Sequence, residues 1–268
     1  MAGFGYIPRR GRIKDLACRI AGHPSFVRRL QAPVLFRMLD LAPGRRVLDI
    51  GCGCGWMTRE LARRSAFAAG VDLRIDRATL RGVPSNCALL ACDAAALPFK
   101  DGAFERVLLS SVLQMVTDDR ALLTEVRRVL APGGKAVLSV PVGYRHLDRF
   151  CAGRGRLHGF LARRMGFPAT REELRRRLGA GFGVRGRGYY EPGGLAALVE
   201  EAGFKVAWAG YAPGRAASAF HEAWIALALL LGLNPSSMLT FVFYPLFAMR
   251  GGSASAAGDE LVMEISVK

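Results

Sequence analysis

Apolar positions along the chain follow two alternating patterns. Compact or alternating apolar runs, typical of strands, occur at 46–50, 67–71, 88–91, 106–109, 135–141, 204–211 and 261–267. Apolar residues recur every three to four positions at about 119–130 and 194–202, which is typical of helices. The same helical period runs through 26–39, between Pro24-Ser25 and Pro43-Gly44. Strands that alternate with helices predict an α/β fold with a parallel, doubly wound sheet.

These patterns divide the chain into four regions. Residues 1–41 form a basic helical cap, and residues 42–143 carry the strand and helix alternation of a nucleotide-binding core. Residues 144–190 are rich in Arg and Gly, which predicts a mobile insertion outside the sheet. Residues 191–268 restore the alternation and include an apolar helical hairpin at about 216–249. A 51% hydrophobic composition over 268 residues supports a buried core and excludes disorder as the main state.

A glycine-rich loop follows the first predicted strand. Gly51-Cys52-Gly53-Cys54-Gly55 leads into a helical segment that begins at Trp56, as in the opening of a nucleotide-binding βαβ unit. Glycines let the backbone turn tightly and let a ligand approach the main chain. The spacing is G-x-G-x-G, whereas dinucleotide-binding proteins have G-x-G-x-x-G. The loop therefore does not require a pyrophosphate ligand.

Three carboxylates stand at the ends of successive predicted strands, namely Asp49, Asp72 and Asp93. In a parallel sheet these ends share one edge, where ligands bind. A carboxylate after the second strand can accept both hydroxyls of a ribose, and one after the third can accept an adenine amine. Asp72 or Asp93 alone would more often be a helix cap or turn residue. All three in register behind a glycine loop favour a ligand that contains ribose and adenine.

Five ordered segments of the core carry a family resemblance: Val47–Gly55, Gly70–Asp72, Cys92–Phe99, Phe104–Leu113 and Leu123–Leu138. They resemble the motifs of class I S-adenosylmethionine-dependent methyltransferases, and in particular the type 11 branch. The resemblance covers about residues 42–142. It implies a Rossmann-like sheet that is mostly parallel with an antiparallel last strand, and S-adenosyl-L-methionine as the cofactor.

The resemblance also implies roles for individual residues. The loop glycines would lie along the methionine part of the cofactor, with Asp49 beneath it and Asp72 on the ribose. Asp93 and Ala94 would frame the adenine, and Ser110 would lie near the sulfonium. The expected cofactor-binding set is Asp49, Gly51, Cys52, Gly53, Gly55, Asp72, Leu73, Asp93, Ala94 and Ser110.

The catalytic residue is unknown from the sequence. Two positions depart from the family, which often has Asp where Glu105 stands and often has His, available as a base, where Met115 stands. Of the remaining histidines, His146 just after the fifth strand is placed to reach the site, or it is an exposed loop residue. Methyl transfer is an in-line displacement that gains much of its rate from positioning and exclusion of water. A strong base is needed only for an alcohol or carbon acceptor.

Charge and cysteine content bear on partners and location. The chain has 38 Lys+Arg against 22 Asp+Glu, or +16, which raises nucleic acid, an anionic membrane or an acidic substrate as partners. Arg supplies 33 of the 38 basic residues, which with abundant Ala and Gly is also typical of a GC-rich genome. The six cysteines contain no C-x-x-C pair and no histidines at zinc spacing. We therefore expect reduced thiols and no metal site. We also expect no signal peptide and a cytoplasmic protein.

Two segments point to a membrane surface. Residues 223–233 and 238–249 are apolar on every face but too short to span a bilayer, so they suit a hairpin in the interface. Burial against the sheet or a partner is the competing interpretation. The segment 145–187 could face anionic headgroups or form a solvated surface. Its arginines are Arg145, Arg149, Arg154, Arg156, Arg163, Arg164, Arg171, Arg175, Arg176, Arg177, Arg185 and Arg187.

The sequence thus predicts a methyltransferase for a small hydrophobic acceptor, such as a quinone, isoprenoid, polyketide or lipid precursor. It would act in the cytoplasm or as a peripheral protein on the inner face of the cell membrane. An RNA methyltransferase is one alternative, although no RNA-binding module is evident. A non-catalytic, membrane-attached scaffold is the other. Candidate acceptor-pocket residues, equally interpretable as packing aromatics, are Phe4, Tyr6, Tyr144, Tyr189 and Tyr190.

Overall fold

The computed structural model describes most of the predicted core and parts of the regions on either side of it. The described residues are 26–77, 79–142, 145–152, 155–170, 172–174, 190–212, 219, 222–223, 225–227, 230 and 260–268. The residues 1–25, and most of the apolar hairpin predicted at 216–249, lie outside this set.

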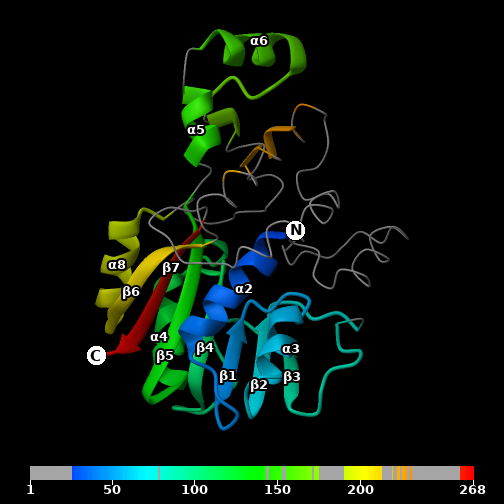
Figure 1. Cartoon of the computed structure of the whole chain (residues 1–268). Coiled ribbons are helices and arrows are strands. Elements are labelled where there is room, and N and C mark those ends of the chain that lie inside the picture. Colours follow the sequence, from blue (N-terminus) through cyan, green and yellow to red (C-terminus); the bar gives the residue numbers. More distant parts are fainter. Residues whose placement is uncertain are drawn as a thin grey trace.

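A seven-stranded sheet forms the centre, with the strand order β3-β2-β1-β4-β5-β7-β6 (Figure 1). All pairings are parallel from β3 to β5, whereas β7 is antiparallel to both of its neighbours. The structure therefore confirms the mostly parallel sheet with an antiparallel last strand. The strands are β1 Arg46–Ile50, β2 Phe67–Asp72, β3 Cys87–Ala91, β4 Phe104–Ser110, β5 Leu130–Pro141, β6 Phe204–Ala212 and β7 Glu260–Val267.

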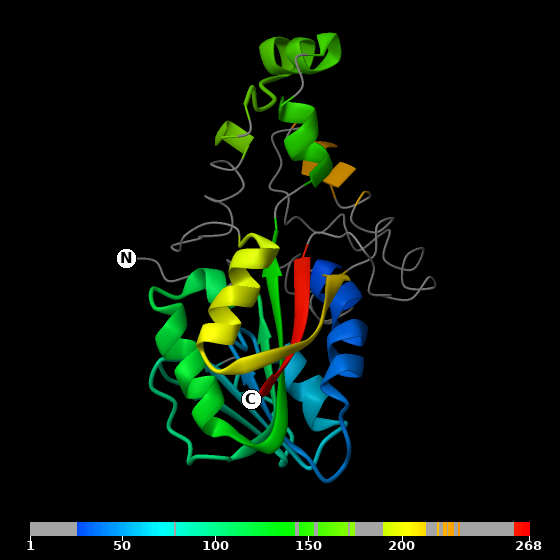
Figure 2. The same ribbon diagram turned by 90° about the vertical axis from the view of Figure 1, so that its left-hand side faces the viewer.

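Helices cover both faces of the sheet. Figure 2 shows α2 (Phe26–Leu39) and α3 (Trp56–Ala62) on one face, and α4 (Asp119–Val129) and α8 (Pro192–Glu201) on the other. A short 3-10 helix, η1 (Leu113–Met115), precedes α4. None of the helices in the described ranges is long and apolar enough to cross a membrane.

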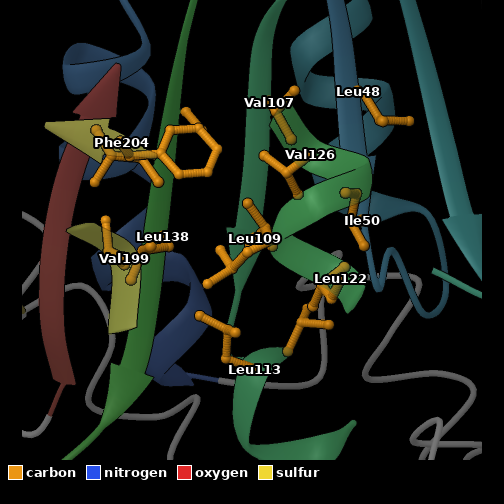
Figure 3. Packing of buried hydrophobic residues seen from close by; sticks show 14 of the residues in the cluster. Leu48, Ile50, Val107, Leu109, Leu113, Leu122, Val126, Leu138, Val199 and Phe204 are labelled. Atoms are coloured by element: carbon orange, nitrogen blue, oxygen red, sulfur yellow. The ribbon is translucent and has the colours of Figure 1, made fainter. Parts of the chain in front are cut away.

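Two layers of buried side chains hold the helices to the sheet. Between the sheet and α4 and α8, Ile50, Leu109, Leu122 and Val126 are fully buried (Figure 3). The layer under α2 and α3 includes Leu35, Leu39, Leu61 and Val137. Full burial of such a side chain contributes roughly 1.5–3 kcal/mol. These layers fix the parallel strands, and with them the edge at which their carboxyl ends meet.

The region predicted as a mobile insertion contains two helices. α5 (Arg145–Ala152) and α6 (Arg156–Met165) lie beyond the carboxyl ends of the parallel strands (Figure 1). Two of the glycines that suggested irregular structure bound α6, because Gly155 precedes the helix and Gly166 ends it with a φ of 63°, whereas Gly159 lies inside it. A separate small core of Cys151, Phe167, Leu174 and Ile225 joins these helices to the segment after β6.

Candidate cofactor and acceptor site

The three predicted carboxylates lie at one edge of the sheet, as their positions in the sequence indicated. Asp49 is the last residue but one of β1 and is only 2% exposed. Asp72 ends β2 and is half-buried, while Asp93 follows β3 and is exposed. Asp93 Oδ1 accepts a hydrogen bond from the Ala95 amide at 2.9 Å, which is a turn contact. Asp49 and Asp72 therefore flank the loop closely, and Asp93 lies after the next strand along the edge, β3.

The glycine loop is tied to β2 by backbone hydrogen bonds. The amides of Gly51 and Cys52 both donate to the Val71 carbonyl, at 2.8 and 3.0 Å. The Gly53 amide donates to Asp72 Oδ2 at 2.9 Å. The loop therefore orients the Asp72 carboxylate, which keeps lone pairs available for a ligand.

Positive φ angles explain why the loop needs glycine. Gly51, Gly53 and Gly55 have φ of 70°, 54° and 67°. A Cβ on Gly51 would overlap the Val112 side chain, so this glycine packs directly against the segment after β4. A Cβ on Gly53 would meet no atom of the described residues within 4 Å. Gly53 therefore presents bare backbone to open space, where a ligand could approach the main chain.

Asp49 carries a carboxyl group that is buried, where a negative charge is unfavourable. Burial raises its pKa to about 7, and the nearby Asp72 charge acts in the same direction. The Thr58 hydroxyl, which donates to Asp49 Oδ2 at 2.6 Å, and the Arg28 guanidinium oppose that shift. A buried carboxylate of this kind favours a cation beside it, which suits a sulfonium or an ammonium group.

Three other predicted cofactor residues lie around the loop. Cys52 is buried, and burial raises the pKa of its thiol, so it is a packing residue in the protonated form. Leu73, directly after Asp72, is 71% exposed and presents an apolar surface beside the loop. Ala94 packs against the core after the end of β3.

Polar groups gather at the opposite half of the edge, after β4. Ser110 ends β4 and is buried, and its Oγ lies 3.4 Å from Ser139 Oγ of β5. Arg28 of α2 donates a hydrogen bond to Ser110 Oγ. Arg28 was not predicted from the sequence, although a signal existed. It lies seven residues before Leu35, on the stripe of α2 that packs on the sheet.

A strained residue follows Ser110. Ser111 has a φ of 53°, a conformation that costs roughly 1–2 kcal/mol in a residue with a Cβ. Its amide donates to the Ser139 carbonyl at 2.9 Å, and its carbonyl accepts from Gln114 Nε2 at 2.8 Å. Its hydroxyl donates to Glu260 Oε1, also at 2.8 Å. Three hydrogen bonds thus hold the strained backbone in place.

The predicted acceptor-pocket residues are only partly described. Phe4, Tyr6, Tyr144 and Tyr189 lie outside the described residues. The Tyr190 hydroxyl donates to Asp119 Oδ2 at 3.0 Å and lies 3.4 Å from the Leu113 carbonyl, so it braces η1 against α4. The backbone of His146 lies in the first turn of α5.

Comparison with known proteins supports the fold and the motif assignment. Residues 48–138 match the methyltransferase domain family known as Methyltransf_11. This part of the chain is therefore similar to the methyltransferase domains of the type 11 family. The matched residues 48–138 include the glycine loop, all three edge carboxylates and Ser110, but neither Arg28 nor Glu260.

The matched relatives extend beyond this methyltransferase domain. Demethylmenaquinone methyltransferase of Corynebacterium urealyticum is 42% identical over 112 residues, which are 40% of this chain and 47% of the relative. The chain thus spans about half the length of the curated relatives it matches. Geranyl diphosphate C-methyltransferase of Streptomyces coelicolor A3(2) has a similar fold, with a TM-score of 0.58 at 16% identity over 98% of this chain and 86% of the other. An S-adenosylmethionine-dependent methyltransferase of Mesorhizobium loti has a TM-score of 0.56 at 20% identity, with coverages of 88% and 97%.

Proposed function

We propose that the protein transfers the methyl group of S-adenosylmethionine to a small hydrophobic acceptor of the quinone class. The observation that supports this most directly is the hydrogen bond that the Gly53 amide donates to Asp72, at a glycine whose other side faces no described atom within 4 Å. The Asp72 carboxylate binds the ribose hydroxyls, and Asp49 attracts the cationic methionine end. Asp93 and Ala94 frame the adenine.

The reaction needs few groups from the protein. The acceptor attacks the methyl carbon in line, the C–S bond breaks, and its electron pair stays on sulfur. S-adenosylhomocysteine and the methylated acceptor are formed, and one proton is released. Ser110 lies next to the reacting centre, and the chain acts chiefly by orienting the two reactants and excluding water. The core at 42–143 holds the cofactor.

Substitution of Asp72 by alanine tests the cofactor site. We expect S-adenosylhomocysteine affinity to fall at least about 30-fold, because each ribose hydrogen bond to a charged carboxylate contributes roughly 1.5–3 kcal/mol. Isothermal titration calorimetry on the full chain measures this. Asp101→Asn, an exposed carboxylate that pairs with Arg128, is the control and should bind normally. Undiminished binding by folded Asp72→Ala would refute the assignment.

The acceptor class comes from the relatives and is tested by turnover. The relatives named demethylmenaquinone methyltransferase match 112 and 107 residues, about 40% of this chain. Labelled methyl transfer from S-adenosylmethionine to a prenylated naphthoquinol should therefore be catalytic, whereas RNA should not be labelled. Cofactor binding without labelling of any quinol, lipid or metabolite extract would instead favour a non-catalytic scaffold.

A membrane surface is the proposed place of the reaction, and α6 carries this part of the proposal. Leu157 and Phe160 are 61% and 54% exposed on this helix, and Arg156, Arg163 and Arg164 are exposed beside them. α6 contains no acidic residue. An apolar and basic helix face is typical of binding to an anionic interface.

Vesicle flotation tests the contribution of α6. The double variant Leu157→Ser, Phe160→Ser should float with anionic vesicles at low salt at least fivefold less than the parent protein, because it loses the apolar contact. Leu80→Ser removes an exposed leucine from the loop before β3 and should float normally. Equal flotation of all three proteins would exclude α6 as the membrane contact.

A further inference from the structure

A buried carboxylate lies where the ends of β4 and β5 meet the start of β7, which we call the acceptor half of the sheet edge. Glu260 is the first residue of β7 and is only 8% exposed. Its Oε1 accepts the hydrogen bond from Ser111, while its Oε2 is buried and has no hydrogen-bond partner within the part of the chain that the structure describes. Buried polar atoms are nearly always hydrogen-bonded, so an exception beside a candidate site calls for a functional explanation.

The segment after β4 connects this carboxylate to the cofactor loop. Val112 packs directly against Gly51 of the loop, and the preceding residue, Ser111, donates to Glu260. Ser110, expected near the sulfonium, comes immediately before. Glu260 is therefore one hydrogen bond away from a three-residue segment that contacts the cofactor loop at its other end.

The backbone of Ser111 is a second unusual feature, next to the unpaired oxygen of Glu260. The positive φ of Ser111 turns its hydroxyl towards β7, and strained residues of this kind concentrate at functional sites. The strained residue and the unpaired carboxylate oxygen share one hydrogen bond. Two unfavourable features that meet in a single contact are explained together if the contact positions Glu260 for chemistry.

We propose that Glu260 is the general base of methyl transfer, an inference that rests on the function proposed above. Oε2 takes the proton from a hydroxyl of the reduced quinone as the O–H bond breaks. The freed electron pair passes into the ring, a ring carbon attacks the methyl group, and the C–S bond breaks with its pair left on sulfur. The ring proton then moves to the oxygen, which restores the aromatic hydroxyl, and Glu260 passes its proton to water.

The surroundings of Glu260 leave its carboxylate available for this step. Its register partners, Pro141 in β5 and Ala212 in β6, carry no charge. Within the described residues no Lys or Arg forms an ion pair with it. Arg28 donates a hydrogen bond to Ser110, the residue before the Ser111 that donates to Glu260. Gln114, the other polar side chain at Ser111, cannot accept a proton. Met115, where the family often has histidine, is equally unable to do so.

The test uses two acceptors with the full chain. One is a prenylated naphthoquinol that is neutral at the assay pH, and the other is a fluorinated analogue that is already ionised. Glu260→Gln should bind S-adenosylhomocysteine within twofold of the parent protein. Its single-turnover rate should fall at least about 100-fold with the neutral acceptor, since general bases typically contribute 10²–10⁴. With the ionised acceptor it should stay within about fivefold, because no proton remains to be removed.

Two further variants complete the design. Glu264→Gln changes a glutamate on the same strand that pairs with Lys135, and it should behave like the parent protein. Glu260→Asp keeps the carboxylate but shortens its reach, so it should show a smaller loss with the neutral acceptor, and it serves if Glu260→Gln does not fold.

The outcomes separate the two proposals. Equal loss with both acceptors would show a structural role, and no loss with either would show that Glu260 is not the base; each result would overturn this inference alone. Failure of the parent protein to methylate either quinol, with cofactor binding intact, would overturn the quinol acceptor and this role with it.

Discussion

Replacement of Asp49 by asparagine is expected to stabilise the protein and to weaken cofactor binding. Because the folded-state pKa is raised from 3.8 to about 7, the folded chain binds this proton more tightly than the unfolded chain. Asp49 therefore favours folding below about pH 4, and this contribution is lost as the pH rises to about 7. Above that pH its burial destabilises the fold by on the order of 4 kcal/mol. Asparagine keeps the bond from Thr58 and removes this cost.

Denaturant unfolding at several pH values measures the effect. The gain in unfolding free energy of Asp49→Asn should be largest at pH 8, should shrink as the pH falls below about 7, and should be lost below about pH 4, where the parent carboxyl is protonated in both states. S-adenosylmethionine affinity at pH 8 should fall more than tenfold, because the cation loses its buried counter-charge. The control Asp101→Asn should change stability by no more than about 1 kcal/mol. A less stable Asp49→Asn at pH 8 would contradict the assigned cost of burial.

Gly51 and Gly53 should respond differently to the same substitution. Gly51→Ala places a methyl group into the Val112 side chain and also forces alanine to a positive φ, so the unfolding free energy should fall by roughly 3 kcal/mol or more. Gly53→Ala shares the backbone strain but meets no neighbour, so its loss should be roughly 1–2 kcal/mol.

Gly53→Ala should be the more stable of the two variants, but it should bind the cofactor more weakly than its stability alone would suggest. The added methyl of Gly53→Ala lies in the space above Asp72, so S-adenosylhomocysteine affinity should fall at least tenfold in a protein that remains folded. Each glycine is thus the matched control for the other, and unfolding and calorimetry are measured on both. Normal binding by Gly53→Ala would place the cofactor elsewhere.

The positions of the glycine loop and of the three carboxylates at the sheet edge could be predicted from the sequence because their signals are local. The strand ends at Asp49, Asp72 and Asp93 are visible in short apolar runs, and the glycine loop is contiguous. Boundaries that depend on tertiary context were less well predicted. The predicted helix at about 119–130 was followed by a strand predicted from 135, but β5 already begins at Leu130, because Leu130 pairs with Phe104 across a shift in register.

The acceptor half of the edge could not be predicted, because its contacts are long-range. Ser111 and Glu260 are 149 positions apart, and Arg28 reaches Ser110 over 82. No local pattern distinguishes a glutamate at the start of an alternating strand from a surface residue. Thr58 was visible after the loop, but its bond to Asp49 depends on how α3 packs over β1.

The position of β7 between β5 and β6 has a consequence for the order of folding. Among the described strands β6 pairs only with β7, although β7 follows it in the sequence, and the edge of β5 that faces away from β4 stays unpaired until β7 arrives. The last two strands must therefore join the sheet late, after closure of a long loop, which is slow. Until then the nascent chain exposes a long strand edge open to aggregation, so this protein is expected to depend on chaperones during synthesis.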